Sequence, residues 1–365
     1  MKRTVSYPFL LATLFAGMTF QGRAQKGPLQ IGDDAPAFKV ATWLKGNPGS
    51  GIERGKVNIV EFWATWCAPC LANVPHLSKL TAEYAPKGVK VFGISVSERK
   101  TVDADSLRRF IAGPKGQGMH YIVGADDSAK YMATNWYQAT GQRGIPFAMV
   151  VDRNGKIAWM GHPAVIEKAL EKIVDGHWDL REQRKLFAED RRLDSIDGSI
   201  IPQFNTYTNP KNNAAGLVAL DSLLQKEPAL KYRHYTAHYT FVFLINTNPE
   251  KAVAFARETW AANDFPDWKG VSDMMHYLQS KNAVLPPSAY VLGADALQAQ
   301  LDHYPWAMNA PDTYNEIASF QFLAGDRAKA VASEEKAIES AKKDEKFSAE
   351  QLAKYQESLN RYKAG

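Results

Sequence analysis

A pair of cysteines, Cys67 and Cys70, follows a short apolar run and stands at the start of a helical pattern. The run Val57–Trp63 is apolar apart from two residues and is short enough to be a buried strand. From Cys67 to Tyr84, large apolar residues recur about one turn apart, which indicates a helix. Pro75 should kink this helix because proline lacks the backbone N–H of a helix interior. The sequence therefore predicts a buried strand followed closely by a helix whose first turn carries two cysteines.

These are the only two cysteines of the chain, and two residues separate them. A disulfide across so short a loop hardly restrains the unfolded chain, so a purely stabilising role is disfavoured. Zinc would need at least two further ligands, and the histidines show no ligand-like spacing. At a helix N-terminus, unpaired N–H groups stabilise a thiolate, the reactive species in disulfide exchange. We therefore expect Cys67 to attack a disulfide and Cys70 to resolve it, with no metal and no cofactor.

Strand and helix patterns alternate around the cysteine pair, and a hairpin closes the series. Its turn, Asp152-Arg153-Asn154-Gly155, lies between two short apolar runs, which is a strong hairpin signal. Alternation of this kind predicts an α/β domain with a mixed central sheet over residues 28–178. The further elements expected are strands at 89–96, 120–123, 147–151 and 156–160, and helices at 105–112, 128–137 and 164–174.

The pattern changes after Trp178. Residues 179–200 are crowded with charges and predict a linker helix, whereas residues 201–365 show helical periodicity without a convincing strand pair. In 312–343, bulky and small residues fall where a 34-residue helix-turn-helix repeat places them. A tetratricopeptide-like repeat and an irregular helical bundle both fit this pattern. We expect an all-α domain of helical hairpins, whose surface could bind a protein partner.

The N-terminus has the three parts of a secretory signal. Lys2 and Arg3 precede a mostly apolar run, Phe9–Phe20, and small residues follow up to Ala24. The run is too short to cross a bilayer core of about 30 Å comfortably. We predict a signal peptide over residues 1–24 and export to the periplasm, with an uncleaved N-terminal membrane anchor as the alternative. The net charge of +5 is mild and partly due to this leader, which argues against nucleic acid as a partner.

Several separated motifs resemble one known family. The segment Val60-Glu61-Phe62-Trp63-Ala64-Thr65-Trp66-Cys67-Ala68-Pro69-Cys70, with Pro75 after it, resembles the active-site segment of the thioredoxin superfamily. The opening Gly32–Phe38 and the triplet Gly144-Ile145-Pro146 before the hairpin are similar to its exported TlpA/ResA-like branch. The resemblance extends over residues 30–175 and implies a thioredoxin-like α/β fold with a mixed sheet, followed here by the all-α helical-hairpin domain.

The resemblance also implies roles for individual residues. Pro146 matches a cis-proline that faces the cysteine pair, and an ordinary trans proline in a turn is the alternative. Ile145 would offer its backbone to an extended substrate, and Trp66 would flank the nucleophile on the docking surface. Trp63 would pack below it.

Glu61 lies in the apolar strand before the cysteines and matches the buried acid of thioredoxins. Burial would raise its pKa and make it a proton acceptor for Cys70. A glutamate on a solvent-facing strand position is the alternative. ResA-like proteins of cytochrome c maturation carry an acid three residues after the second cysteine, where this chain has Asn73. That departure weakens the expectation that apocytochrome c is the substrate.

The sequence thus favours an exported thiol–disulfide oxidoreductase that acts on protein thiols and disulfides, more readily as a reductase than as an oxidant. A reductase in that compartment implies a membrane electron donor. The alternative is a helical client-binding module with a secondary or degenerate redox domain.

Overall fold

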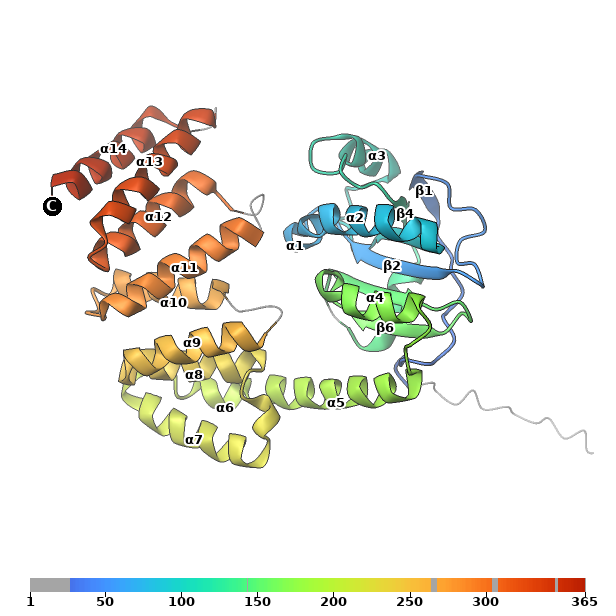
Figure 1. Ribbon diagram of the computed structural model, residues 1–365, viewed down its shortest axis with the longest axis horizontal. Coiled ribbons are helices and arrows are strands. Elements are labelled where there is room, and N and C mark those ends of the chain that lie inside the picture. Colours follow the sequence, from blue (N-terminus) through green and yellow to red (C-terminus); the bar gives the residue numbers. More distant parts are fainter. Residues whose placement is uncertain (1–26, 143, 264–267, 304–307, 345–346, 365) are drawn as a thin grey trace, which may run out of the picture.

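The computed structural model describes residues 27–142, 144–263, 268–303, 308–344 and 347–364. The expected signal peptide, 1–24, lies outside these residues. Within them, no helix combines the length and the apolar character needed to cross a bilayer. The N-terminal half is built on one sheet, and a long helix, α5 (Leu180–Ser199), leads from it to a stack of helices (Figure 1).

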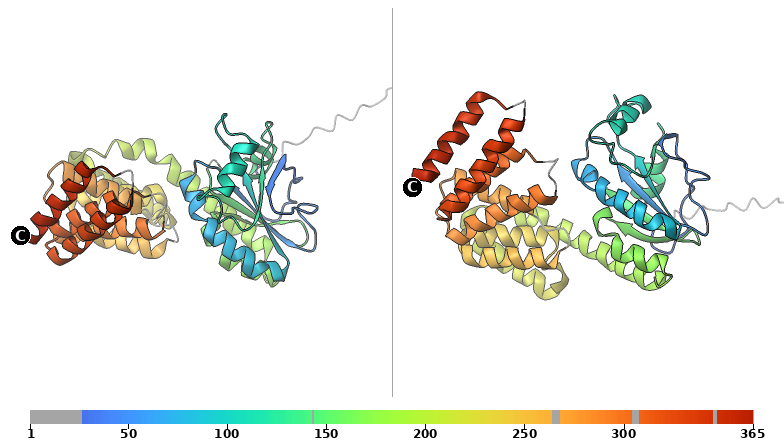
Figure 2. Two further views of the ribbon diagram at one scale, coloured as in Figure 1. Left: turned by 90° about the horizontal axis from the view of Figure 1, so that it is seen from above. Right: turned by 45° about the horizontal axis from the view of Figure 1, so that its top comes forward.

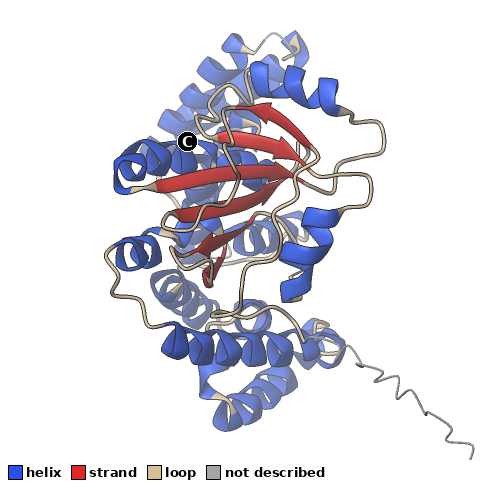
Figure 3. Ribbon diagram, turned by 90° about the vertical axis from the view of Figure 1, so that its right-hand side faces the viewer, coloured by secondary structure: helices blue, strands red, loops and turns tan. Residues whose placement is uncertain are grey.

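The sheet has six strands in the order β1-β4-β3-β2-β5-β6, and Figure 3 shows them side by side. Strands β2, β3 and β4 run parallel to one another. On one side, β5 pairs antiparallel with β2 and β6 pairs antiparallel with β5, and on the other side β1 pairs antiparallel with β4. The predicted mixed sheet is therefore confirmed. The strands are β1 (Thr42–Lys45), β2 (Val57–Trp63), β3 (Val89–Ser95), β4 (Ile122–Ala125), β5 (Phe147–Val151) and β6 (Ile157–Gly161).

Strand β2 is the buried centre of the sheet, and its side chains alternate between two cores. Ile59 and Trp63 belong to the core that also contains both cysteines. Val60 and Phe62 belong to the core on the opposite face. The helices of this half are α1 (Ala68–Ala72), α2 (Val74–Tyr84), α3 (Ala104–Ala112) and α4 (Glu167–Val174).

Two helical predictions in this half need correction. The helix expected from Cys67 to Tyr84 is broken at Asn73 rather than kinked at Pro75. Pro75 falls in the first turn of α2, where no intrahelical N–H is required, so the interruption comes before the proline. The helix expected at 128–137 is instead mainly a π-helical turn, η2 (Ala133–Tyr137), followed by a 3₁₀ turn, η3 (Gln138–Thr140).

Smaller differences concern the ends of elements. The weak strand expected at 120–123 pairs as Ile122–Ala125, because Phe92–Ser95 of β3 sets its register. The helix expected at 164–174 begins with a 3₁₀ turn, η4 (Pro163–Val165), and continues as α4.

The C-terminal helical region, residues 200–364, stacks its helices in chain order from α7 to α14 (Figures 1 and 2). Ile317 and Ala318 of one helix and Ala330 of the next are fully or almost fully buried, which closes the helical hairpin expected at 312–343. Among the described residues after the sheet, the regular elements are all helices, which confirms the predicted all-α region. The helices are α6 (Ile201–Asn205), α7 (Asn213–Lys226), α8 (His234–Thr247), α9 (Pro249–Ala262), α10 (Trp268–Ser280), α11 (Pro287–His303), α12 (Ala310–Leu323), α13 (Arg327–Lys343) and α14 (Ala349–Ala364).

Candidate active site

Cys67 and Cys70 are joined by a disulfide bond at the start of α1. Cys67 is the N-cap residue of this helix, and its Sγ accepts a hydrogen bond from the backbone N–H of Cys70 at 3.2 Å. The same contact would stabilise a thiolate at Cys67 after reduction. Both cysteines are almost fully buried, whereas the neighbouring Trp66 is 48% exposed. The sulfurs thus lie just beneath a surface marked by an exposed aromatic ring.

The loop before β5 lies against the first cysteine. The Ile145–Pro146 peptide bond is cis, as the family resemblance implies. The Sγ of Cys67 is 3.7 Å from the carbonyl oxygen of Ile145. Antiparallel pairing of β5 with β2 brings these segments together although more than seventy residues separate them in the chain.

A second loop, directly after β3, holds the residues that precede Cys67. The Glu98 carboxylate accepts hydrogen bonds from the backbone N–H and the hydroxyl of Thr65, each at 2.8 Å. The carbonyl oxygen of Ser97 accepts a hydrogen bond from Trp66 Nε1 at 3.0 Å. Neither loop residue was expected from the sequence. Their position past the carboxyl end of a buried parallel strand was the available signal, because sites form at that edge.

Glu61 points to the same face of β2 as Trp63 and is 1% exposed, which rules out the solvent-facing alternative. Both of its carboxylate oxygens lack a hydrogen-bond partner among the described residues. Burial raises the pKa of Glu61 well above its ordinary value. Trp63, on the same face of β2, lies in the core that contains both cysteines. The role of Glu61 as a proton acceptor for Cys70 stays a prediction.

Glycine at position 93 makes room for this acid. A Cβ added there would lie 3.4 Å from Glu61 Oε2 and only 2.7 Å from the Tyr121 ring. Tyr121 is itself buried, and its pKa is raised well above the ordinary value by burial and by the nearby Glu61. Sequence patterns had not indicated Tyr121, because it lies in the weak strand pattern expected at 120–123 and carries no motif.

Asn73, which stands where ResA-like proteins have an acid, is buried at the break between α1 and α2. Its side-chain Nδ2 donates to the carbonyl oxygen of Pro69 at 2.8 Å. The Asn73 amide thus donates a hydrogen bond to a carbonyl oxygen of the short active-site helix, and an ionised carboxylate could not donate this bond.

A pocket of about 450 Å³ adjoins the cysteine pair on the side of Trp66. Leu71 and Val74 give it an apolar wall, and Arg99 and Lys115 add positive charge. Within the described parts of the chain, neither cation has an ion-pair partner. No group of three or more potential metal-binding side chains occurs among those residues either.

Comparisons with known proteins agree with this geometry. Residues 30–175 match the family model described as Redoxin. FixW of Rhizobium leguminosarum is 32% identical over 153 residues, which are 41% of this chain and 68% of that protein. The thiol-disulfide oxidoreductase ResA of Bacillus cereus is 30% identical over 138 residues, 37% of this chain and 70% of that protein.

Among solved structures, the thioredoxin domain of a thiol-disulfide oxidoreductase from Bacteroides vulgatus is 25% identical, with a TM-score of 0.33. The match covers 40% of this chain and 99% of that one. The Redoxin match ends at residue 175, before the C-terminal helical region, and the family assignment rests on the curated relatives. Together with the disulfide at the N-cap of α1, they establish that the chain belongs to the TlpA/ResA-like branch of the thioredoxin superfamily and is a thioredoxin-like thiol–disulfide oxidoreductase.

Proposed function

We propose that the protein reduces disulfides of exported proteins by dithiol–disulfide exchange at Cys67 and Cys70. The observation that carries the proposal is the position of Cys67. Its sulfur caps a helix, accepts a backbone hydrogen bond and lies beside an exposed tryptophan. Cys70 lies one turn further in, within reach of the first sulfur and away from solvent.

The reaction begins from the reduced pair. The Cys67 thiolate attacks one sulfur of a substrate disulfide, whose S–S bond breaks, and the departing substrate thiolate takes up a proton. Cys70 then loses its proton and attacks the sulfur of Cys67, which releases the second substrate thiol. Two electrons have passed to the substrate, and the enzyme holds the Cys67–Cys70 disulfide. An external dithiol donor at the membrane restores the reduced pair by the reverse exchange.

Glu61 acts as the acceptor for the Cys70 proton in the second step. An ionised carboxylate without hydrogen-bond partners in a buried core is a strong base, since protonation relieves the cost of burying the charge. Once the disulfide has formed, the proton leaves Glu61 for solvent. The cis-Pro146 loop and the ring of Trp66 hold the substrate segment while these transfers take place.

The pocket beside Trp66 indicates the substrate class. An apolar side chain next to the substrate cysteine would fit against Leu71 and Val74, and an acidic side chain would pair with Arg99 or Lys115. We therefore expect preference for protein disulfides flanked by an apolar and an acidic residue. A basic residue in the same place would be disfavoured by like-charge repulsion.

The experiment is capture of substrates by a Cys70→Ser variant, in which the mixed disulfide with Cys67 cannot be resolved. Periplasmic proteins trapped this way should release on addition of dithiothreitol. A Cys67→Ser variant serves as the control and should trap none of them. Insulin reduction by the wild-type chain should be lost in Cys67→Ser; unchanged turnover in that variant would refute the proposal.

Direction is tested separately. A reductase requires a Cys67–Cys70 couple near the reducing, thioredoxin-like end of the range, about −270 mV, whereas an oxidant lies near −120 mV. Equilibration of the purified chain with glutathione or dithiothreitol buffers measures this potential. A value at the oxidising end would reverse the assignment of direction and leave the exchange chemistry intact.

A second candidate is client binding by the helical region, with residues 28–178 as the redox domain, 179–200 as a linker and 201–365 as a binding domain. The α1 end of the sheet half faces the helical region (Figures 1 and 2), which favours this candidate. Tyr277 and Val284 are exposed apolar side chains of that region. Loss of turnover in Cys67→Ser with client binding retained would show that the two activities are separable.

A further inference from the structure

Helix α5 is attached to the sheet half along its first part. Leu180 and Phe187 pack against the cores on the two faces of the sheet. Arg184 donates to the carbonyl oxygen of Ile31 and pairs with Asp33 at 2.9 Å. These contacts make the helix part of the redox half and exclude a loosely tethered linker in this stretch.

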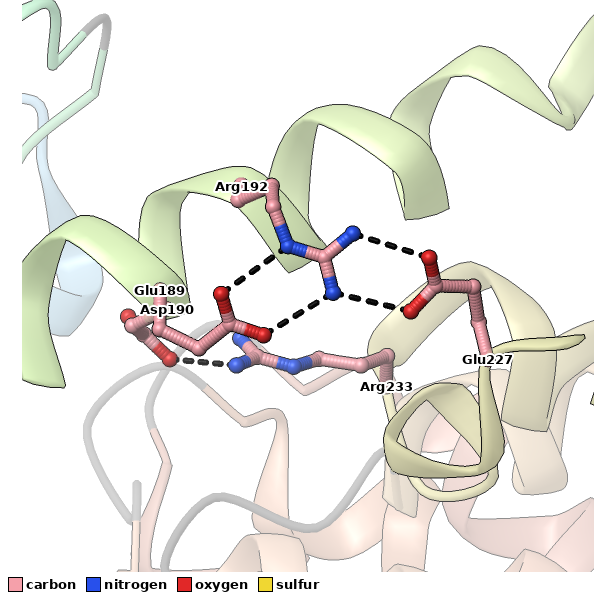
Figure 4. A network of polar contacts seen from close by, with 5 residues as sticks. All are labelled: Glu189, Asp190, Arg192, Glu227 and Arg233. Atoms are coloured by element: carbon pink, nitrogen blue, oxygen red, sulfur yellow. Dashed lines mark hydrogen bonds and ion pairs between the residues drawn. The ribbon is translucent and has the colours of Figure 1, made fainter.

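The second part of α5 is attached equally firmly to the helical region. Figure 4 shows Arg192 forming a bidentate pair with Glu227, at 2.9 and 2.8 Å, while Glu189 holds its other side. Arg233 pairs with Asp190 and Asp194 of α5.

Asp197, 3% exposed, adds a buried anchor. Its carboxylate accepts hydrogen bonds from the first backbone N–H groups of α8 at Tyr235 and Thr236 and from the Thr236 hydroxyl. A single helix therefore connects the two halves rigidly.

Within the second attachment, Arg191 contacts the segment that precedes the cis-Pro146 loop. Its Nη1 donates to the carbonyl oxygen of Thr140 at 2.5 Å. Gly141 has a φ of +84°, a backbone conformation that favours glycine, and a Cβ at this position would displace the Arg191 guanidinium. Arg191 thus covers the base of the loop that leads to cis-Pro146.

Two hydrogen-bonded routes lead from Thr140 to the docking surface. Toward the cis-Pro146 loop, the Thr140 hydroxyl accepts from the Gln142 N–H at 3.2 Å, and the Gln142 side chain reaches the carbonyl oxygen of Gly144 at 3.4 Å. Gly144 directly precedes Ile145, whose carbonyl lies against Cys67.

The other route leads to the tryptophan beside the nucleophile. The Thr140 hydroxyl donates to the carbonyl oxygen of Tyr137 at 2.5 Å, and the Tyr137 hydroxyl lies 3.2 Å from the Ser97 hydroxyl. The carbonyl of Ser97 in turn holds the ring of Trp66. Both sides of the substrate-docking surface are therefore connected to Thr140, through its hydroxyl, and the carbonyl oxygen of the same residue accepts the hydrogen bond from Arg191 of α5.

We infer that Arg191 is a positioning residue for protein substrates: through Thr140 it sets the cis-Pro146 loop and Trp66, and so makes the helix that carries the helical region a part of the redox site. The inference rests on the proposed function for its kinetic consequence. Arg191 touches neither cysteine, so the exchange chemistry itself does not depend on it. Substrate docking does, because a polypeptide must fit between the two surfaces that Arg191 holds.

The test uses the full chain with Arg191→Met, which removes the donors and keeps most of the side-chain length. Arg191→Lys can still donate one hydrogen bond to Thr140. Arg181→Met removes an exposed arginine from the first turn of the same helix and serves as the matched control. With insulin as substrate, Arg191→Met should raise KM about tenfold with little change in kcat, the lysine variant should recover part of this, and the control should match wild type.

Two further measurements separate positioning from general damage. Reaction of the reduced enzyme with a small aromatic disulfide and the potential of the Cys67–Cys70 couple should be unchanged in Arg191→Met. Amide hydrogen exchange should accelerate in residues 138–142 but not in β5. The inference is overturned if KM of Arg191→Met stays at the wild-type value. It is also overturned if the rise in KM is accompanied by a loss of small-disulfide reactivity and of hydrogen-exchange protection in β5. Exchange needs no turnover, so it tests Arg191 even if the wild-type chain proves inactive and the proposed function fails.

Discussion

The Glu98 carboxylate grips Thr65 with both oxygens, accepting its backbone N–H and its hydroxyl at 2.8 Å each. Thr65 stands two residues before Cys67, so this contact fixes the turn from β2 into α1. Ser95 donates to the same carboxylate at 2.8 Å. The nucleophile is thus oriented by a loop that comes directly after the neighbouring strand.

Replacing Glu98 should slow disulfide exchange. Glu98→Ala leaves the N–H and hydroxyl of Thr65 without these acceptors, and we expect kcat/KM for insulin to fall about tenfold. Glu98→Gln keeps one carbonyl oxygen at the site and should lose less. An equal loss in both variants would contradict a role for these hydrogen bonds and point to the charge instead.

Glu61 should make stability depend on pH. Since burial raises its pKa in the folded state, the neutral acid is compatible with folding, and stability is lost as the pH rises through that raised value. Each unit of elevation corresponds to about 1.4 kcal/mol at a pH above it. Glu61→Gln should therefore raise the urea midpoint at pH 8 and leave it nearly unchanged at pH 4.

The same substitution should slow resolution of the mixed disulfide, because Cys70 loses its proton acceptor. Rapid-mixing kinetics on the reduced enzyme would separate this step from the first attack. Glu83→Gln, at an exposed position of α2, is the matched control and should show neither effect. A Glu61→Gln variant with the wild-type dependence of stability on pH would contradict the assignment.

Glu334 predicts a second pH effect, in the helical region. It is fully buried within α13, and burial raises its pKa to about 7. In the orientation that lets it donate, the Asn315 amide lies 3.1 and 3.2 Å from the two carboxylate oxygens. Stability should be complete in acid and decline as the pH rises through about 7.

Glu334→Gln should abolish this decline, so that its melting temperature exceeds that of wild type at pH 8.5 but not at pH 5. Thermal unfolding followed by circular dichroism measures both. Glu357→Gln, an exposed change on α14, should melt like wild type at each pH. Equal melting of Glu334→Gln and wild type at pH 8.5 would argue against ionisation of this buried acid.

The anchors of α5 should differ in strength according to their burial. Asp197→Ala leaves the start of α8 uncapped in a buried place and should cost about 1–3 kcal/mol of unfolding free energy. Glu227→Gln breaks the pair with Arg192 drawn in Figure 4, where both partners are partly exposed, and should cost less than about 1 kcal/mol. Urea unfolding of both variants compares them, and a larger loss in Glu227→Gln would reverse this ranking.

The elements that the sequence predicted correctly are those specified by neighbours in the chain. Strand β2 runs from Val57 to Trp63 as expected, because a short and mostly apolar run favours a buried strand. The hairpin formed by β5 and β6 is explained by its Asn-Gly turn. Helix α1 begins immediately after Cys67, where Pro69 is compatible with a first turn. Local pattern and turn chemistry were sufficient in each case.

Local pattern also placed helices after Trp178. It did not place the break in the helix expected from Cys67 to Tyr84, because the break at Asn73 depends on the hydrogen bond that its buried side-chain amide makes. The π-helical and 3₁₀ turns from Ala133 to Thr140 were missed for a similar reason. The carbonyl oxygen of Thr140 accepts a hydrogen bond from Arg191, and the Tyr137 hydroxyl contacts the Ser97 hydroxyl, so partners from distant segments hold these turns.

The sequence by itself determined the redox pair, the sheet that carries it and the helical character of the C-terminal half, because periodicity and motif spacing are properties of consecutive residues. Only the tertiary structure decided that Glu98 holds Thr65, that Tyr121 lies beside Glu61 and that Arg191 reaches Thr140. These contacts join residues tens of positions apart, and strand pairing and helix packing bring them together. No pattern along one segment encodes which side chain will arrive from another.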